Sequence, residues 1–343
     1  MSATRGWPVL LASVVILLGC STEPESPTSS VQAGHSAIVH AEHFAAAGWT
    51  DPVNLGPVVN SADMDVNAAL SPDERTLYFV SNRPGGLGGN DIWASHRKCK
   101  TCDWETPYNL GAPINSAAAE GAPTLSHDGR MLFFFTTRED SLGLADIYVS
   151  HRVGSNDHSD DDDDGDNDEE APAAWGTPQN LGPFVNNELA QNGSYYTREG
   201  GRNAFLYFNH VFGADKGSLD IYRAELGKDG MPLGPAVAVS ELNSSAADQK
   251  VAISKDGLEL FLSSNRTGTT GNFDIWRFTR RSVHQEWSTP PEHLGAPINT
   301  EFIDSQPNLS RDGRTLIFTS NRPGGFGNSD LWMSTRMRED RDD

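Results

Sequence analysis

Short apolar runs separated by turn residues repeat along this chain with a period of about 55 residues. Each copy starts with a short apolar stretch that meets a Ser-x-Asp-Gly turn, in which Asp bonds local amides and Gly takes a positive φ. A run that is apolar on both faces follows, such as 316–318, and a Gly-rich loop such as 322–327 leads into an Asp-Ile-Trp segment or its equivalent. Such runs are expected of strands covered on both sides, so the pattern predicts an all-β protein.

Five copies of this unit are present, and the third is the most divergent. A further segment that begins at Trp104, Trp175 or Trp287 marks a fourth strand. Four antiparallel strands per repeat are typical of a β-propeller blade. Aligned on the turn, the copies share a hydroxyl at Ser71, Ser126, Thr197, Ser254 and Ser310, and an aspartate that opens the third strand at Asp91, Asp146, Asp220, Asp274 and Asp330.

The two ends of the repeat region complement each other. Residues 49–55 match a fourth strand without its first three, and the last copy ends with a third strand, 330–332, that has no fourth. If the first segment completes the last blade, no open sheet edge is left. The sequence therefore predicts a five-bladed β-propeller over residues 47–336. An open solenoid is the alternative, but it would carry polar capping repeats, and none is visible.

The first twenty residues have the pattern of an export signal. Arg5 supplies a positive start, and residues 9–18 form an apolar stretch too short to span a bilayer comfortably. The sequence 17–20, Leu-Leu-Gly-Cys, resembles the bacterial lipobox, which implies lipid attachment at Cys20; an ordinary signal peptide with an incidental cysteine is the alternative. We expect a signal peptide over 1–20, a flexible tether over 21–46 and a charged tail over 337–343. Ser21, in place of the Asp that retains lipoproteins at the inner membrane, implies an outer-membrane lipoprotein of the cell envelope.

The repeats resemble the WD40-like β-propeller repeat of bacterial envelope proteins. The Ser-Pro-Asp turn at 71–73 and the Ser-Asn-Arg-Pro-Gly-Gly loop at 81–86 carry the resemblance, which spans 49–335. Related propellers occur in the Tol-system periplasmic protein, in OmpA-family lipoproteins and in prolyl-oligopeptidase-like peptidases. We expect this chain to lack the extra domains of those proteins. The resemblance thus implies the propeller and its envelope setting and transfers no catalytic residue.

The formal net charge of −21 makes nucleic acid and anionic lipid surfaces poor partners, so the only membrane contact we expect is the lipid anchor. Much of the charge lies in an insert, 154–170, between the third and fourth strands of the second blade. An EF-hand interpretation fits part of it, but position twelve is Ala171 and no flanking helices are apparent. A disordered, solvated loop is favoured, and no cofactor is expected beyond weak Ca²⁺ binding at Asp160, Asp162, Asp164 and Asp166.

Two cysteines, Cys99 and Cys102, remain after Cys20. In an oxidising exported compartment a local disulfide between them is the favoured interpretation. A zinc site would need two more ligands, and only His96 lies near. A redox role would need the pair at a helix N-terminus, whereas the sequence places it in a loop after a strand.

When the repeats are aligned, the position six residues before the turn hydroxyl is polar in every copy, and we call these residues the polar column. If the first strand is innermost, the side chains of this column surround one mouth of the central channel. A cation or a cationic ligand could bind there, because clustered carboxylates need a counter-charge. The regular repetition favours the alternative, in which each carboxylate is hydrogen-bonded within its own blade. The column consists of Asp65, Glu120, Gln191, Asp248 and Asp304.

Two other columns, the third-strand aspartates and the arginines Arg83, Arg138, Arg266 and Arg322, are expected to brace loops. The Gly-rich loops 83–90 and 322–329 are the expected partner surface, because recognition on rigid scaffolds is carried by loops. We therefore expect a binding or scaffold protein that recognises an envelope protein or glycan, and not an enzyme. The alternative is a glycoside hydrolase with central carboxylates, which requires two acids in distinct environments.

Overall fold

The computed structural model describes residues 48–153, 174–200, 203–211 and 218–336. The expected signal peptide with Cys20, the tether, the acidic insert with its four candidate Ca²⁺ ligands, and the charged tail lie outside these residues and stay predictions. Within the described ranges, no helix has both the length and the apolar character needed to cross a membrane. One short helix, α1 (Gly56–Val59), precedes the first inner strand.

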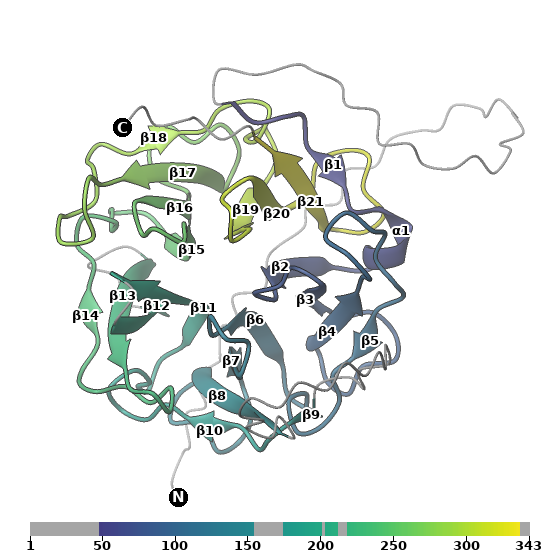
Figure 1. Ribbon diagram of the computed structural model, residues 1–343, viewed down its shortest axis with the longest axis vertical. Coiled ribbons are helices and arrows are strands. Elements are labelled where there is room, and N and C mark those ends of the chain that lie inside the picture. Colours follow the sequence, from purple (N-terminus) through teal and green to yellow (C-terminus); the bar gives the residue numbers. More distant parts are fainter. Residues whose placement is uncertain (1–47, 154–173, 201–202, 212–217, 337–343) are drawn as a thin grey trace, which may run out of the picture. The chain divides into compact units, whose positions relative to one another are not determined.

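Five antiparallel sheets surround a central axis (Figure 1), so the predicted all-β five-bladed propeller is confirmed. In four blades the chain runs from the innermost strand outwards, and in the second blade both β9 and β10 pair with β8. From the inside out, the first blade consists of β2 (Asp65–Leu70), β3 (Thr76–Ser81), β4 (Asp91–His96) and β5 (Tyr108–Asn109), and the second of β6 (Glu120–Leu125), β7 (Met131–Thr136), β8 (Asp146–Val153), then β9 (Ala174–Trp175) and β10 (Gln179–Asn180). The third blade consists of β11 (Gln191–Glu199), β12 (Asn203–Val211), β13 (Leu219–Leu226) and β14 (Val237–Ala238), and the fourth of β15 (Asp248–Ile253), β16 (Glu259–Ser264), β17 (Asp274–Thr279) and β18 (Glu292–His293). The fifth blade consists of β19 (Asp304–Leu309), β20 (Thr315–Ser320), β21 (Asp330–Thr335) and β1 (Val53–Asn54).

The last blade is closed by the start of the repeat region, as the sequence predicted. Strand β1 pairs antiparallel with β21, with Val53 opposite Met333. Just before β1, Trp49 is completely buried and forms an isolated bridge with Arg336. The Arg336 guanidinium lies 4.5 Å from the Trp49 ring centroid and donates to Glu259 Oε1 of the fourth blade at 2.8 Å. The closure is thus a main-chain pairing reinforced by a half-buried cation that connects two blades.

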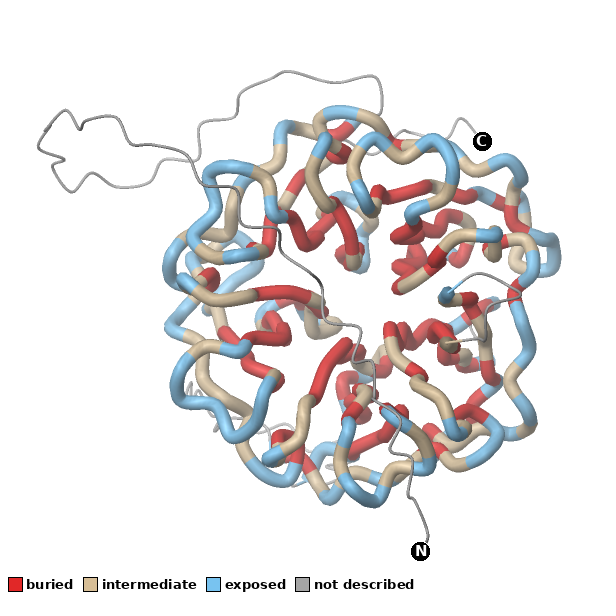
Figure 2. Tube along the Cα trace, turned by 180° about the vertical axis from the view of Figure 1, so that it is seen from behind, coloured by how far each residue is buried: buried red, intermediate tan, exposed pale blue. Residues whose placement is uncertain are grey.

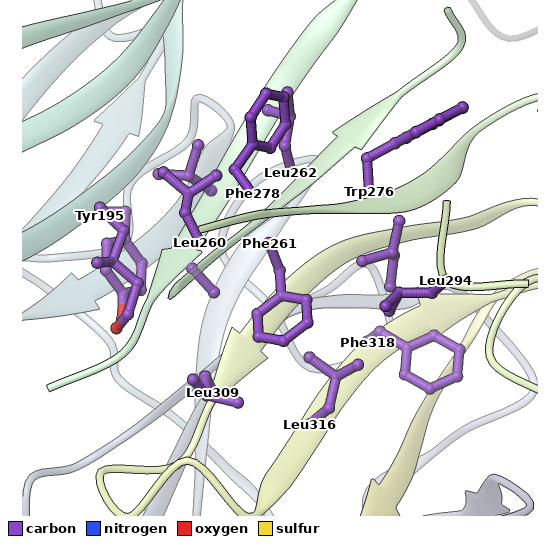
Figure 3. Packing of buried hydrophobic residues seen from close by; sticks show 14 of the residues in the cluster. Tyr195, Leu260, Phe261, Leu262, Trp276, Phe278, Leu294, Leu309, Leu316 and Phe318 are labelled. Carbon is purple, nitrogen blue, oxygen red and sulfur yellow. The ribbon is translucent and has the colours of Figure 1, made fainter. Parts of the chain in front are cut away.

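The apolar core lies between neighbouring blades. Figure 2 shows buried residues concentrated in the strands around the axis and exposed residues in the outer loops. Between the fourth and fifth blades, Phe261 of β16 packs in one cluster with Leu309 of β19 and Leu316 of β20 (Figure 3). Middle strands are therefore apolar on both faces, because each blade is covered by a blade on either side.

Each inner strand carries a bulge at an equivalent position, and the residue at the bulge has a positive φ. These residues lie four before the turn hydroxyl and connect blades around the channel. Asn67 N donates to Gln306 Oε1 at 3.2 Å, and Lys250 Nζ donates to the backbone oxygen of Ser194 at 3.2 Å. Only one of the five is a glycine; the set is Asn67, Ala122, Gly193, Lys250 and Gln306.

Candidate functional site

The five inner strands run in the same direction along the central channel, so the two mouths of the channel differ in the residues they carry. We call the end where these strands begin the carboxylate mouth; it carries the column that starts at Asp65. The end where they finish, at the Ser-x-Asp-Gly turns, we call the turn mouth. Strand β2 contributes Asp65 to the first and leads into Ser71 at the second. The structure thus places the predicted polar column at one end of the channel.

At the carboxylate mouth, three Asp side chains bind an arginine of their own blade. Asp65 Oδ1 accepts from Arg83 Nη2 at 2.5 Å, while its Oδ2 accepts from the amide and hydroxyl of Ser61 at 2.5 and 2.8 Å. The carboxylate is completely buried. Asp248 and Asp304 repeat the arrangement, and the arginine is always 18 residues further along the chain. These contacts are the within-blade hydrogen bonds of the alternative interpretation.

The arginines are themselves held by two aromatic rings and a backbone oxygen. The Arg83 guanidinium lies 5.0 Å from the Phe79 ring centroid and 5.3 Å from that of Trp93, and Nη2 also donates to the backbone oxygen of Val59 at 2.6 Å. Because the pair is buried and its hydrogen bonds are satisfied, a ligand cation would have to displace a cation that is already bound.

The third blade has neutral groups at this end of its inner two strands. Gln191 stands where the other blades have a carboxylate, and His210 lies across the sheet from it, at the position that Ser81 holds in the first blade. His210 Nε2 lies 3.2 Å from the Val185 backbone oxygen, so it donates there, and Asn187 Nδ2 lies 3.2 Å from Nδ1. Burial lowers the pKa of His210, which favours the neutral ring.

Glu120 is the least tightly paired member of the column. Its Oε1 lies 3.4 Å from Arg138 Nη2, against 2.5 to 2.6 Å in the three Asp pairs. Its other contacts are hydroxyls and one amide: Ser116 Oγ at 2.5 Å, Thr136 Oγ1 at 2.8 Å and Ser116 N at 3.0 Å. Glu120 is thus the member of the column that is held mainly by hydroxyls and not by a close guanidinium.

The third-strand aspartates hold the loops that precede them. Asp91 accepts from Gly88 N at 3.2 Å, from Leu87 N, and from Asn109 Nδ2 at 2.8 Å. In the fourth blade His293 takes the role of Asn109, with Nε2 2.6 Å from Asp274 Oδ2. This column shapes loops at the carboxylate mouth.

Cys99 and Cys102 are joined by a disulfide in the loop after β4, with their Cα atoms 5.0 Å apart. In the described parts of the chain, no group of three or more His, Cys, Asp or Glu side chains is arranged to hold a metal ion. The candidate Ca²⁺ ligands lie outside those parts, so weak Ca²⁺ binding stays a prediction.

The turn mouth holds a cavity that sequence reasoning missed. Its volume is about 80 Å³, and all five blades contribute to its wall. The residue after each turn hydroxyl points to this end, and four of these five residues are basic or histidine. The signal was present in the sequence as the variable position of the Ser-x-Asp-Gly turns: Pro72, His127, Arg198, Lys255 and Arg311.

The loops around the carboxylate mouth expose large apolar side chains. Leu142 is 55% exposed and Leu144 is 70% exposed in the loop after β7. Leu87 and Phe326 are also exposed, and they lie in the two loops, 83–90 and 322–329, that the sequence indicated as a partner surface. Scattered exposed apolar residues are ordinary, but several around one face are typical of contact surfaces.

Comparisons with protein-family models and with curated proteins found no match. Among solved structures, the chain is similar to a thermostable family-43 glycoside hydrolase, with a TM-score of 0.55 and 13% identity over 83% of this chain and 93% of that one. It is also similar to α-L-arabinofuranosidase from Lactobacillus brevis, with a TM-score of 0.54 and 14% identity over 84% and 95%. TolB from Acinetobacter baumannii matches with a TM-score of 0.47 and 15% identity over 81% and 55%, a likeness too low to carry an argument.

These likenesses concern the fold, and they correct one expectation. We expected a protein that is not an enzyme, because the candidate acids are equivalent members of a repeat. The finding that overturns this is that nearly the whole chains of two glycoside hydrolases share the fold. Equivalence among blades is therefore no argument against catalysis. The resemblance to WD40-like envelope propellers is supported only as far as the five-bladed propeller itself.

Proposed function

We propose that this chain is a glycoside hydrolase whose acid and base are carboxylates of the carboxylate mouth. The observation that supports this best is that the match covers 93% and 95% of the two hydrolases, so that it spans nearly all of each chain. The second support is that carboxylates begin four of the five inner strands of this propeller. Glycosidic hydrolysis requires one carboxyl group that donates a proton and a second that acts as base or nucleophile.

Glu120 is the candidate acid. Of the four carboxylates it has the most distant guanidinium, so its environment differs from that of the other three. Asp65, Asp248 and Asp304, each with a close guanidinium partner, are the candidates for the base or nucleophile. All four are completely buried, so the proposal requires that substrate binding displaces loop residues at this mouth.

The test is hydrolysis of aryl glycosides by the purified protein, beginning with the α-L-arabinofuranoside because one similar structure is an arabinofuranosidase. We expect Glu120→Gln to lower kcat by about 100-fold or more, the usual loss for a general acid. Glu301→Gln, an exposed glutamate in the loop before β19, is the matched control and should keep full activity. Thermal denaturation of both variants separates lost chemistry from lost folding. Absence of hydrolysis across a panel of pentosides and hexosides would reject the proposal.

A second candidate function is binding of a protein partner through the loops of the carboxylate mouth. The observation that favours it is the exposure of Leu142, Leu144 and Phe326 on these loops, since exposed apolar side chains gathered on one face are typical of protein contact surfaces. Crosslinking in envelope fractions should capture one partner. Leu144→Ser should reduce that capture, while Leu233→Ser, an equally exposed leucine between β13 and β14, should not.

We further propose that Cys20 is lipidated and anchors the protein in the outer membrane. The Leu-Leu-Gly-Cys sequence at 17–20 and the Ser at position 21 support this. Metabolic labelling with an alkyne fatty acid should tag the wild-type chain in an outer-membrane fraction. Cys20→Ala should remove the label, and Cys99→Ala should leave it in place.

A further inference from the structure

The turn mouth has a charge opposite to that of the protein as a whole. The chain has a formal net charge of −21. Yet the wall of the turn-mouth cavity contains Lys255, Arg311 and His127 and no Asp or Glu. The acids of the turns face their own backbone: Asp312 Oδ1, for example, accepts from Ser310 Oγ at 2.7 Å and from Arg314 N at 3.0 Å. The cavity is therefore a positive site on a negative protein.

The cations at this mouth have no carboxylate partner. Among the described residues, neither Lys255 nor Arg311 forms an ion pair, and both are exposed. The nearby Glu74 is buried; it accepts the Arg311 backbone amide at 3.2 Å and lies 3.4 Å from Lys100 Nζ. Arg198 donates through Nε to Tyr196 Oη at 3.3 Å. Unpaired guanidinium and ammonium groups at the rim of a cavity are the donors that bind carboxylate and phosphate.

The cations at the turn mouth all lie close enough to act on His127. Burial lowers the pKa of His127, and the charges of Arg311, Arg198 and Lys255 lower it further. These groups belong to four different blades, so their fields converge across the mouth from several sides. The wall also contains apolar side chains, including Leu125, Leu309 and Ile253, beside hydroxyl and amide groups.

We propose that the turn mouth binds the oxyanion group of a small organic ligand, a carboxylate or a phosphate ester. Lys255 and Arg311 hold the charged group at the rim, His127 contributes a ring nitrogen, and the compact organic part enters the cavity. The cavity volume of about 80 Å³ limits the ligand to a small body. This site lies at the opposite end of the inner strands from Glu120, so it stands independently of the proposed hydrolysis.

The test is calorimetric titration of the full chain at fixed ionic strength with three probes: glucuronate, inorganic phosphate and neutral glucose. We expect both anions to bind and glucose not to bind. A stronger response to glucuronate indicates that the organic body contributes, and an equal response to phosphate indicates a site for the bare oxyanion. Lys255→Gln and Arg311→Gln should each weaken binding about tenfold, because each removes a charged hydrogen bond. Raising the salt concentration should weaken binding further.

Arg314→Gln is the matched control, since Arg314 lies on the same turn as Arg311, is equally exposed and is not part of the cavity wall. It should bind both anions as the wild type does. The proposal is overturned if neither anion binds at millimolar concentration, if glucose binds as well as glucuronate, or if Arg314→Gln weakens binding as much as Arg311→Gln. Hydrolytic activity of Arg311→Gln, measured in parallel, keeps this result separate from the proposed function.

Discussion

The two mouths of the channel are both built from columns of equivalent charged residues, yet they differ in how the charges are used. At the carboxylate mouth, Asp304 is completely buried and bound to Arg322 at 2.5 Å. At the turn mouth, Lys255 and Arg311 are exposed, and no ion pair to either is present in the described chain. A column paired within each blade stabilises that blade, whereas a column left unpaired is directly available to a ligand. The repetition of a charged residue in every blade does not distinguish the two cases. Whether each charge has an ion-pair partner does.

The largest effect that would test this contrast is loss of an acid from the carboxylate mouth. We expect Asp304→Ala to lower the free energy of unfolding by about 3–5 kcal/mol, because Arg322 would remain largely buried without its partner. Urea denaturation measures the change. Lys255→Ala at the turn mouth is the control and should stay within about 0.5 kcal/mol of the wild type. Similar losses in the two variants would remove the distinction between the mouths.

Much of this architecture was predictable from the sequence. The period of about 55 residues gave five blades, and the fourth-strand pattern around Trp49 predicted the closure that pairs Asn54 with Trp332. Both features are visible as local patterns of apolar residues. Each blade buries equivalent strand positions, so the same apolar pattern recurs in every repeat. The column of arginines and the column of carboxylates could each be identified in the aligned repeats.

Hydrogen bonds of each carboxylate within its own blade were favoured from the sequence, but which arginine binds which carboxylate was not predictable, and neither was the channel interior. Asp65 and Arg83 meet only because a hairpin brings positions 18 apart to one end of the sheet. The inner-strand bulges have a positive φ at Asn67, Ala122, Lys250 and Gln306, and none of these is a glycine that would mark the conformation. The position after each turn hydroxyl carries no single repeated residue type, so no column of the aligned repeats marks the turn mouth.

Between the two mouths, Lys250 offers the next largest effect. It is 2% exposed, its Nζ has one hydrogen bond, to Ser194 O, and burial lowers its pKa to about 7 from the ordinary 10.5. Below pH 7 both the folded and the unfolded chain are protonated at this site, so the folded chain bears the full cost of a buried charge. Lys250→Met should therefore raise the free energy of unfolding at pH 6, on the order of 2 kcal/mol after loss of the hydrogen bond.

The sign of the pH dependence follows from the same shift. Between pH 7 and 10.5 the unfolded chain binds more protons at Lys250, so wild-type stability rises with pH through this group. The advantage of Lys250→Met over the wild type should shrink across that range. Chemical denaturation at pH 6, 8 and 10 measures it, and other titrating groups cancel in the difference. An advantage that is constant with pH would mean that Lys250 is not a buried cation.

A smaller effect is expected when Glu120 is replaced by its amide. Gln191 occupies the equivalent position and keeps the equivalent bond, with Oε1 accepting from Asn187 N at 2.9 Å. Glu120→Gln can therefore keep the hydrogen bond from the Ser116 amide. The weak contact with Arg138, at 3.4 Å, contributes little that could be lost. We expect a loss of about 1 kcal/mol in unfolding free energy. A loss as large as that of Asp304→Ala would show that Glu120 is paired as tightly as the aspartates.

The smallest effect tests whether the charges at the turn mouth converge as described. Burial and the nearby cations Arg311, Arg198 and Lys255 together lower the pKa of His127. Arg311→Gln removes one cation and leaves burial unchanged, so the pKa should move upward and still remain below its ordinary 6.5. Titration of the imidazole signals by NMR measures this shift. Arg314→Gln, on the same turn but not among the charges that act on His127, should leave it unmoved. If both variants shift His127 equally, the cations form only a diffuse surface charge, and the contrast with the internally paired carboxylate mouth loses its physical basis.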